Sequence, residues 1–157
     1  MNILVLCTGN SARSIMAEAL INALSGGRHR GYSAGSQPKA EPHPLALQTL
    51  ARHRHAVDGL ASKSWDVFAE PGAPAIDAVI TVCDSAAAEA CPVWPAAPAT
   101  AHWGLPDPAA IEDPDAARAA FEETYRALRT RIEAVLAADP DPADRAALKA
   151  ALEAAHR

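Results

Sequence analysis

A cysteine and an arginine with five residues between them frame a small polar loop near the N-terminus. The stretch VLCTGNSARS (5–14) leads from an apolar segment into Cys7, continues through small residues and closes on Arg13 and Ser14. A loop that enters a helix N-terminus directs several backbone N–H groups, and the positive end of the helix dipole, into one concavity. The arginine adds a planar guanidinium that fits two oxygens of a tetrahedral anion. The pattern therefore predicts an oxyanion-binding loop with a thiol at its floor.

Each residue type in this loop has an expected role. Gly9 lets the backbone approach a ligand closely, Asn10 holds the loop from inside by bonding its backbone, and Ser14 donates a hydrogen bond to the Cys7 sulfur. The positive field of the loop should lower the pKa of Cys7 and hold it as a thiolate. The predicted oxyanion-binding residues are Thr8, Gly9, Asn10, Ser11, Ala12 and Arg13. The predicted chemistry is attack of this thiolate on the central atom of the bound anion.

An aspartate between two prolines is the candidate proton donor for such a reaction. Asp107 stands in GLPDPAA (104–110), just after a predicted strand. Loops at the C-terminal ends of parallel strands converge on one crevice, which would let Asp107 face Cys7 and protonate a leaving oxygen. The same pattern is typical of a simple turn. The residues alone leave both interpretations open.

Apolar runs that alternate with amphipathic segments predict the elements that position these residues. Strands are expected over 2–7, 30–36 and 76–83, with a fourth strand and the turn after it within 100–109. Helices are expected over 14–24, 41–53, 62–69 and 114–138. This order is typical of an α/β fold, a four-stranded parallel sheet flanked by helices in three layers.

The C-terminal segment is expected to lie at the periphery of this fold. Residues 1–138 are expected to form the main domain, and residues 139–157 a helical extension of the same domain. The apolar stripe of the extension is thin, consisting mainly of Leu148 and Leu152. We therefore expect a peripheral element with freedom to move.

Composition narrows the class of protein. The chain has 157 residues, enough for one domain with its own core, and a net charge of −5, which argues against broad nucleic-acid binding. No apolar run approaches the roughly 20 residues of a membrane span, and the N-terminus lacks the basic leader of a signal peptide. Three cysteines without a secretory signal argue against a disulfide framework. These features predict a cytoplasmic protein with reduced thiols and no membrane or nucleic-acid partner.

Two segments carry a resemblance to a known family. CTGNSARSIMAEAL and LPDPA resemble the low-molecular-weight protein tyrosine phosphatases, and more closely the arsenate reductases built on that fold, over residues 2 to about 137. The resemblance implies that Cys7 is the nucleophile, Arg13 the anion ligand and Asp107 the general acid. It also implies no tightly bound cofactor, with arsenate or phosphate as the bound oxyanion.

Three features favour the reductase branch of this family. The phosphatases usually carry a tyrosine where this chain has Ala109, and the segments PHPLALQTL (42–50) and SKSWDVF (62–68) resemble the reductase pattern. ITVCDSAAAEACPVWP (80–95) resembles the reductase redox segment. The resemblance implies that Cys83 attacks Cys7 and that Cys91 then attacks Cys83, in successive thiol–disulfide exchanges. The external reductant would be a thioredoxin-type protein, or glutathione with a glutaredoxin-like partner.

Two departures from the family pattern concern the loop and a cation. The thioredoxin-coupled enzymes often have a further cysteine where this chain has Ala12. Some members bind potassium behind the loop through four residue types, of which Asn10, Glu18 and Ser33 match three, and Lys63 stands near the fourth position. The Lys63 ammonium is therefore expected to replace the ion. The six histidines show no convincing ligand spacing, and no metal site is expected.

Three functions remain compatible with these motifs. The first is reduction of arsenate by Cys7, Cys83 and Cys91. The second is hydrolysis of phosphomonoesters through a phosphocysteine on Cys7, with no relay. The third is a non-catalytic regulatory protein that only binds an oxyanion, against which the intact Cys7 and Asp107 argue.

Overall fold

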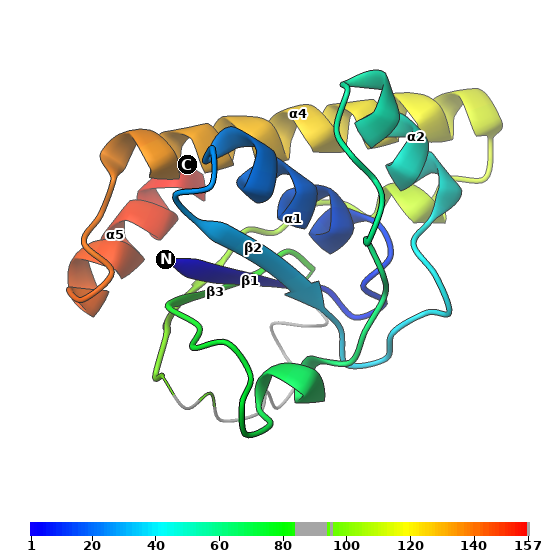
Figure 1. Ribbon diagram of the computed structural model, residues 1–157. Helices are drawn as coiled ribbons and strands as arrows, with labels where there is room; N and C mark the ends of the chain where they lie inside the picture. The colour runs from blue at the N-terminus through cyan, green and yellow to red at the C-terminus, as the bar shows by residue number, and fades with distance from the viewer. Residues whose placement is uncertain (84–93, 95, 157) are drawn as a thin grey trace.

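Four parallel strands form the centre of the molecule (Figure 1). The computed structural model describes residues 1–83, 94 and 96–156. The strands are β1 (Asn2–Leu6), β2 (Arg30–Ala34), β3 (Ala78–Thr81) and β4 (Ala99–His102), in the order β2-β1-β3-β4. Every neighbouring pair is parallel. The predicted α/β fold with a four-stranded parallel sheet is confirmed.

Four α-helices and two 3₁₀ helices accompany the strands in the described part of the chain. The α-helices are α1 (Arg13–Leu24), α2 (Pro44–Arg52), α4 (Pro114–Ala138) and α5 (Arg145–His156), and two 3₁₀ helices are η1 (Trp65–Phe68) and η2 (Pro108–Ala110). Helix α4 starts after Asp113, whose carboxylate accepts the N–H of Ala116 at 2.8 Å, and ends at Asp139 in the left-handed conformation. The segment expected as a helix over 62–69 contains only the 3₁₀ turn η1, because the chain before it is extended and Ser64 forms a parallel bridge with Gly35.

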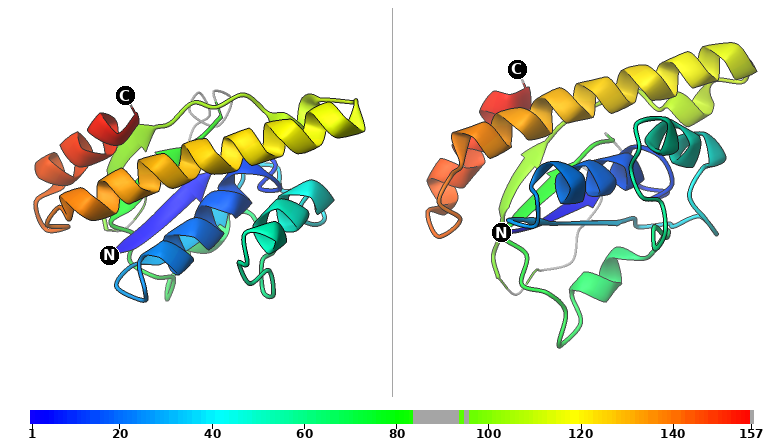
Figure 2. Two further views of the ribbon diagram at one scale, coloured as in Figure 1. Left: turned by 90° about the horizontal axis from the view of Figure 1, so that it is seen from above. Right: turned by 45° about the horizontal axis from the view of Figure 1, so that its top comes forward.

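The two central strands, β1 and β3, are buried on both faces along most of their length. Helices α1, α4 and α5 lie on one face, as Figure 2 shows, and pack on Ile3, Val5 and Ile80. Among the described residues, the other face is covered by η1 and by Trp94, which lies in one apolar cluster with Leu4 and Leu6. Because side chains alternate between the faces of a strand, burial on both faces explains the unbroken apolar sequence of β1.

The C-terminal helix is part of the core, which corrects the expectation of a peripheral extension. Leu148 and Leu152 are fully buried, and the buried indole N–H of Trp103 donates to the carbonyl oxygen of Leu152 at 2.8 Å. Arg145, the first residue of α5, pairs with Asp77, which directly precedes β3, at 3.1 Å. The thin apolar stripe predicted weak packing, but two leucines at helical spacing are enough to anchor α5. The helix covers β4, which lies at the edge of the sheet, and also packs against α4.

Replacing Leu152 with alanine should therefore lower the free energy of unfolding by about 3 kcal/mol, the middle of the range for a buried leucine. Chemical denaturation followed by fluorescence of the buried tryptophans measures this change. Glu153→Ala is the matched control, because the neighbouring side chain is half exposed and its ion pair is with Lys149 on the same helix. A loss below 1 kcal/mol in Leu152→Ala would show that α5 is not part of the cooperative core.

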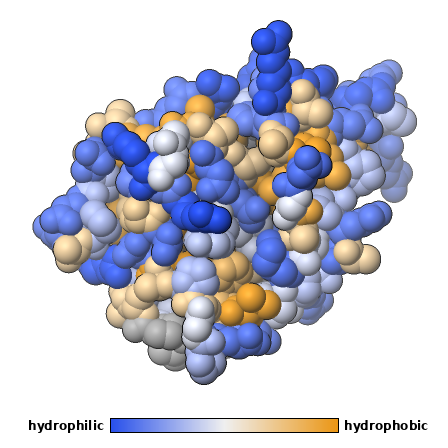
Figure 3. Space-filling view, viewed as in Figure 1, coloured by the Kyte–Doolittle hydropathy of each residue, from blue (hydrophilic) through white to orange (hydrophobic). Residues whose placement is uncertain are grey.

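Few large apolar side chains are exposed on the described part of the surface. Figure 3 shows a mainly hydrophilic face on which apolar residues form small separate patches. Val67 and Ile111 are the large apolar residues that are exposed in the described part of the chain. Within residues 1–83, 94 and 96–156, none of the helices combines the length and the hydropathy that crossing a bilayer requires.

Candidate active site

The predicted loop connects β1 to α1 at the carboxyl end of the sheet. Strand β1 ends at Leu6, Cys7 follows, and α1 begins at Arg13. Ala12 occupies the N-cap position and provides no side-chain hydrogen bond to the first turn, which also contains no acidic residue. The N–H groups of this helix end are therefore not capped by the protein's own side chains, which suits an external anion.

A second segment fixes the direction of the loop's peptide groups. The N–H groups of Gln37, Lys39 and His43 donate to the carbonyl oxygens of Thr8, Gly9 and Ser11 at 3.0, 2.9 and 2.8 Å. The C=O and N–H of one trans peptide point in opposite directions, so the N–H groups that follow these carbonyls face the concave side of the loop. The sequence pattern predicted the donors of this cradle, but not the segment that orients them.

Arg13 closes the loop with its guanidinium buried. One terminal N–H donates to the carbonyl oxygen of Leu105 at 2.7 Å, and the other terminal nitrogen lies 3.8 Å from a carboxylate oxygen of Asp107. Its Nε is buried and has no hydrogen-bond partner in the part of the chain that the structure describes. A buried donor without a partner is costly, and a bound oxyanion would satisfy it.

The predicted chemical groups come together in one cavity of about 330 Å³. Cys7, Arg13, Cys83 and Asp107 all line it. Asp107 is about half exposed and caps η2 by accepting the N–H of Ala109 at 3.0 Å, so the turn aims its carboxyl into the cavity mouth. Cys91 lies outside the described residues, and its predicted role stays a prediction.

Cys7 and Cys83 are neighbours at the floor of this cavity. Both thiols are buried, and Cys83 also accepts the backbone N–H of Thr8 at 3.3 Å. The hydrogen bond between the Cys83 side chain and Cys7, together with burial, raises the pKa of Cys7 above its ordinary value, although Arg13 and the Gly9 backbone act in the opposite direction. The expected low pKa is thus corrected: the loop supplies the predicted positive field, but the second thiol and burial outweigh it.

Asn10 holds the loop in an unusual backbone conformation. Its φ of 44° lies in the left-handed region, which asparagine tolerates better than most residues. Its side chain donates to the hydroxyl oxygen of Ser14 at 2.9 Å and accepts the backbone N–H of Lys63 at 2.8 Å. Asn10 therefore ties the loop to a distant segment instead of to the loop's own backbone. The proposed hydrogen bond from Ser14 to the Cys7 sulfur stays a prediction.

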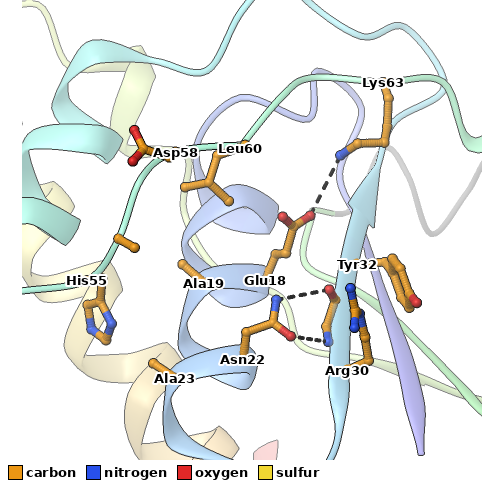
Figure 4. Close-up of a pocket in the computed structure, with 13 residues that line it drawn as sticks. Glu18, Ala19, Asn22, Ala23, Arg30, Tyr32, His55, Asp58, Leu60 and Lys63 are labelled. Atoms are coloured by element: carbon orange, nitrogen blue, oxygen red, sulfur yellow. Dashed lines mark hydrogen bonds and ion pairs between the residues drawn. The ribbon is translucent and has the colours of Figure 1, made fainter. Parts of the chain in front are cut away.

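The Lys63 ammonium fills the position expected for a cation behind the loop (Figure 4). Its nitrogen lies 3.6 Å from the Glu18 carboxylate and donates to the carbonyl oxygens of Ser33 and Ala61 at 3.0 and 2.7 Å. The Ser33 hydroxyl donates to the same Glu18 oxygen at 2.7 Å. The ammonium thus lies between these oxygens, and the expectation that it replaces a potassium ion stays a prediction. Among the described residues, no three histidine, cysteine or carboxylate side chains lie close enough together to hold a metal ion.

Two residues of the cavity were not predicted from the sequence. Gln37 and Lys39 line it from the segment that follows β2. They stand in SQPKAEP, a proline-containing stretch with no periodicity and no motif. Their position depends on the backbone pairing with the loop, which only the three-dimensional structure reveals.

Comparisons with known proteins agree with this geometry. The sequence profile described as low molecular weight phosphotyrosine protein phosphatase matches residues 2–150. An arsenate reductase of Bacillus licheniformis is 35% identical over 121 residues, which cover 77% of this chain and 84% of that protein. The thioredoxin-dependent arsenate reductase of Corynebacterium glutamicum superimposes with a TM-score of 0.63 at 25% identity, over 87% of this chain but only 60% of that one. An arsenate reductase of Archaeoglobus fulgidus gives 0.62 at 25% identity, over 83% and 98% of the two chains.

Proposed function

We propose that this chain, which belongs to the low molecular weight phosphotyrosine protein phosphatase family, reduces arsenate to arsenite. The observation that carries the proposal is the second buried thiol, Cys83, which lines the same cavity as the nucleophile Cys7. A phosphatase of this family needs one thiol at the floor of its loop. A reductase needs a second thiol within reach of the first, because two electrons must pass to arsenic.

The first step uses the residues that both activities share. The loop N–H groups and Arg13 bind arsenate. The Cys7 thiol, whose pKa is raised, passes its proton to an arsenate oxygen, and the resulting thiolate attacks arsenic. An As–S bond forms while an As–O bond breaks, and Asp107 donates a proton so that the oxygen leaves as water. Arsenic is still As(V) in this adduct.

The second step transfers the electrons. The Cys83 thiolate attacks the Cys7 sulfur, an S–S bond forms, and the electron pair of the breaking As–S bond stays on arsenic, which leaves as arsenite. Cys91 then attacks Cys83, which releases Cys7 as a thiolate and leaves a Cys83–Cys91 disulfide. A dithiol of the thioredoxin class reduces that disulfide and is itself oxidised. A reductant of this kind acts in a reducing cytoplasm, which is where we propose the protein works.

Turnover of arsenate by the purified, reduced protein tests this function. We expect multiple turnovers with a thioredoxin system, and the same preparation is assayed with glutathione and glutaredoxin and with a small aryl phosphate. Turnover only with glutathione would keep the reductase and remove Cys91 from the relay. Hydrolysis of the aryl phosphate without any arsenate reduction would overturn the proposal in favour of a phosphatase.

Potassium should have no effect on this activity. Because the Lys63 ammonium holds the cation position beside Glu18, the arsenate turnover in potassium chloride should equal that in sodium chloride at the same ionic strength. Steady-state rates at several concentrations of each salt measure this. In Lys63→Met the Glu18 carboxylate loses its counter-ion, and we expect a potassium-specific gain in rate to emerge. A steep rise with potassium in the unaltered protein would contradict the assignment.

A further inference from the structure

Lys39 is the charged residue of the cavity that the proposed reaction leaves unused. Its backbone N–H donates to the carbonyl oxygen of Gly9 at 2.9 Å, and it lines the same cavity as Cys7 and Arg13. Its aliphatic stem lies over Gly9, since a Cβ at that position would meet Lys39 Cε at 3.3 Å and Cγ at 3.4 Å. The side chain is exposed, yet it follows the loop, so its ammonium is held near the cavity mouth.

The charges already in the cavity leave room for a second cation. Arg13 lies at the floor, but one of its N–H groups is bound to the Leu105 carbonyl, and Asp107 at 3.8 Å offsets part of its charge. No carboxylate of the described residues lies within ion-pair distance of Lys39. Lys39 therefore contributes a positive charge that the carboxylates of the described residues do not neutralise.

The ligand chemistry differs before and after the reaction. Arsenate and phosphate are mixtures of monoanion and dianion near neutral pH and become mainly dianionic above it, whereas arsenite is released as neutral arsenous acid. A cation at the mouth attracts the dianion and speeds its entry, and it has no charge to hold on the neutral product. Such a residue strengthens substrate binding without slowing product release.

We propose that the Lys39 ammonium binds the outer oxygens of the tetrahedral dianion held by the loop and sets the affinity of the site for dianions. The step from anion affinity to catalysis rests on the proposed function. The anion affinity itself does not, because it is measurable without turnover.

Lys39→Met tests the inference, since methionine keeps an unbranched stem over Gly9 and removes the charge. We expect the dissociation constant of inorganic phosphate, measured by calorimetry on the reduced protein, to rise about tenfold at low ionic strength. The difference should shrink as sodium chloride is added, because salt screens an exposed charge. The KM for arsenate should rise by the same factor, with kcat changed by less than about twofold.

Two further variants separate charge at this position from other effects. Lys39→Arg keeps the charge and should bind phosphate within about threefold of the unaltered protein. Lys149→Met removes the same charge from α5, where the ammonium donates to the carbonyl oxygen of Thr100. It should leave phosphate binding unchanged, and thermal unfolding should verify that all three variants are folded.

Each remaining outcome has a definite meaning. Unchanged phosphate affinity in Lys39→Met would overturn the inference and leave Lys39 as a cover for Gly9. A lower kcat with the thioredoxin system at unchanged phosphate affinity would overturn it as well, and would indicate contact with the reductant. Weaker phosphate binding in a protein that reduces no arsenate would contradict the proposed function and support the inference.

Discussion

Replacing Cys83 with serine should abolish catalytic reduction of arsenate and spare hydrolysis of an aryl phosphate. Without the second thiol, the As(V) adduct on Cys7 has no internal electron donor, and turnover with a thioredoxin system should fall at least about a thousandfold. Phosphate ester hydrolysis uses only Cys7, the loop and Asp107, all of which stay in place. The measurement is arsenite formation and aryl phosphate hydrolysis on one preparation of the protein.

Cys7→Ser is the control for this pair of assays. It removes the nucleophile of both reactions, so both activities should disappear together. If Cys83→Ser kept catalytic arsenate reduction, the relay would be wrong, and the electrons would have to come directly from an external thiol. If Cys83→Ser lost both activities with the fold intact, the role of Cys83 would be to shape the loop.

The same position controls the ionisation of the nucleophile. The side-chain hydrogen bond between Cys7 and Cys83 is the largest cause of the raised pKa of Cys7, and the charge of Cys83 adds to it. Cys83→Ala removes both causes, so the pKa of Cys7 should fall. Alkylation of Cys7 by iodoacetamide requires the thiolate, and its rate should therefore reach its plateau at lower pH in Cys83→Ala than in the unaltered protein. A shift of the alkylation profile to higher pH would contradict this.

The sequence allowed the local features of the site to be predicted, and it failed where the outcome depends on distant segments. The apolar run of β1, the small residues after Cys7 and the start of α1 are contiguous in the chain, so the anion-binding loop follows from local patterns. The raised pKa of Cys7 depends on Cys83, which comes from the end of another strand. Lys39 reaches the cavity only because its backbone pairs with Gly9. No periodicity or motif encodes either contact.

The C-terminal helix shows the same limit for packing. Leu148 and Leu152 make a stripe too thin to predict burial from the segment itself. Their burial is decided by the open face beside β4 and by Trp103, whose indole N–H finds its acceptor on α5. The strand order that leaves β4 at the edge depends on the whole chain, and it cannot be predicted from residues 139–157 alone.

The second large effect, a loss of stability, is expected at Gly35. This residue directly follows β2 and lies against the start of the oxyanion loop. A Cβ at this position would overlap two backbone carbonyl oxygens, those of Thr8 and of Cys7, the second at 2.5 Å. Gly35 also accepts the N–H of Trp65 and donates to the carbonyl of Lys63, so it is held on both sides. The backbone cannot yield without moving Cys7 or the segment that carries Lys63.

Gly35→Ala should therefore lower the free energy of unfolding by about 3 kcal/mol, at the upper end of the usual range for overpacking. The folded fraction of Gly35→Ala should also bind phosphate more weakly, because the displaced carbonyl groups belong to the oxyanion loop. Denaturant titration and phosphate calorimetry on one sample measure both effects.

Gly9→Ala is the matched control for this substitution, in the same loop region. The three nearest atoms that its added methyl group would meet belong to the flexible stem of Lys39, the first at 3.3 Å, and the backbone at Gly9 is not in the left-handed region. The stem can move aside, so the loss of stability should stay below about 1 kcal/mol. Equal losses of stability in the two variants would mean that the cost of the added methyl group does not depend on whether it meets rigid backbone or a flexible side chain. A large loss only in Gly35→Ala would show that rigid backbone contact between β2 and the loop fixes the position of the nucleophile.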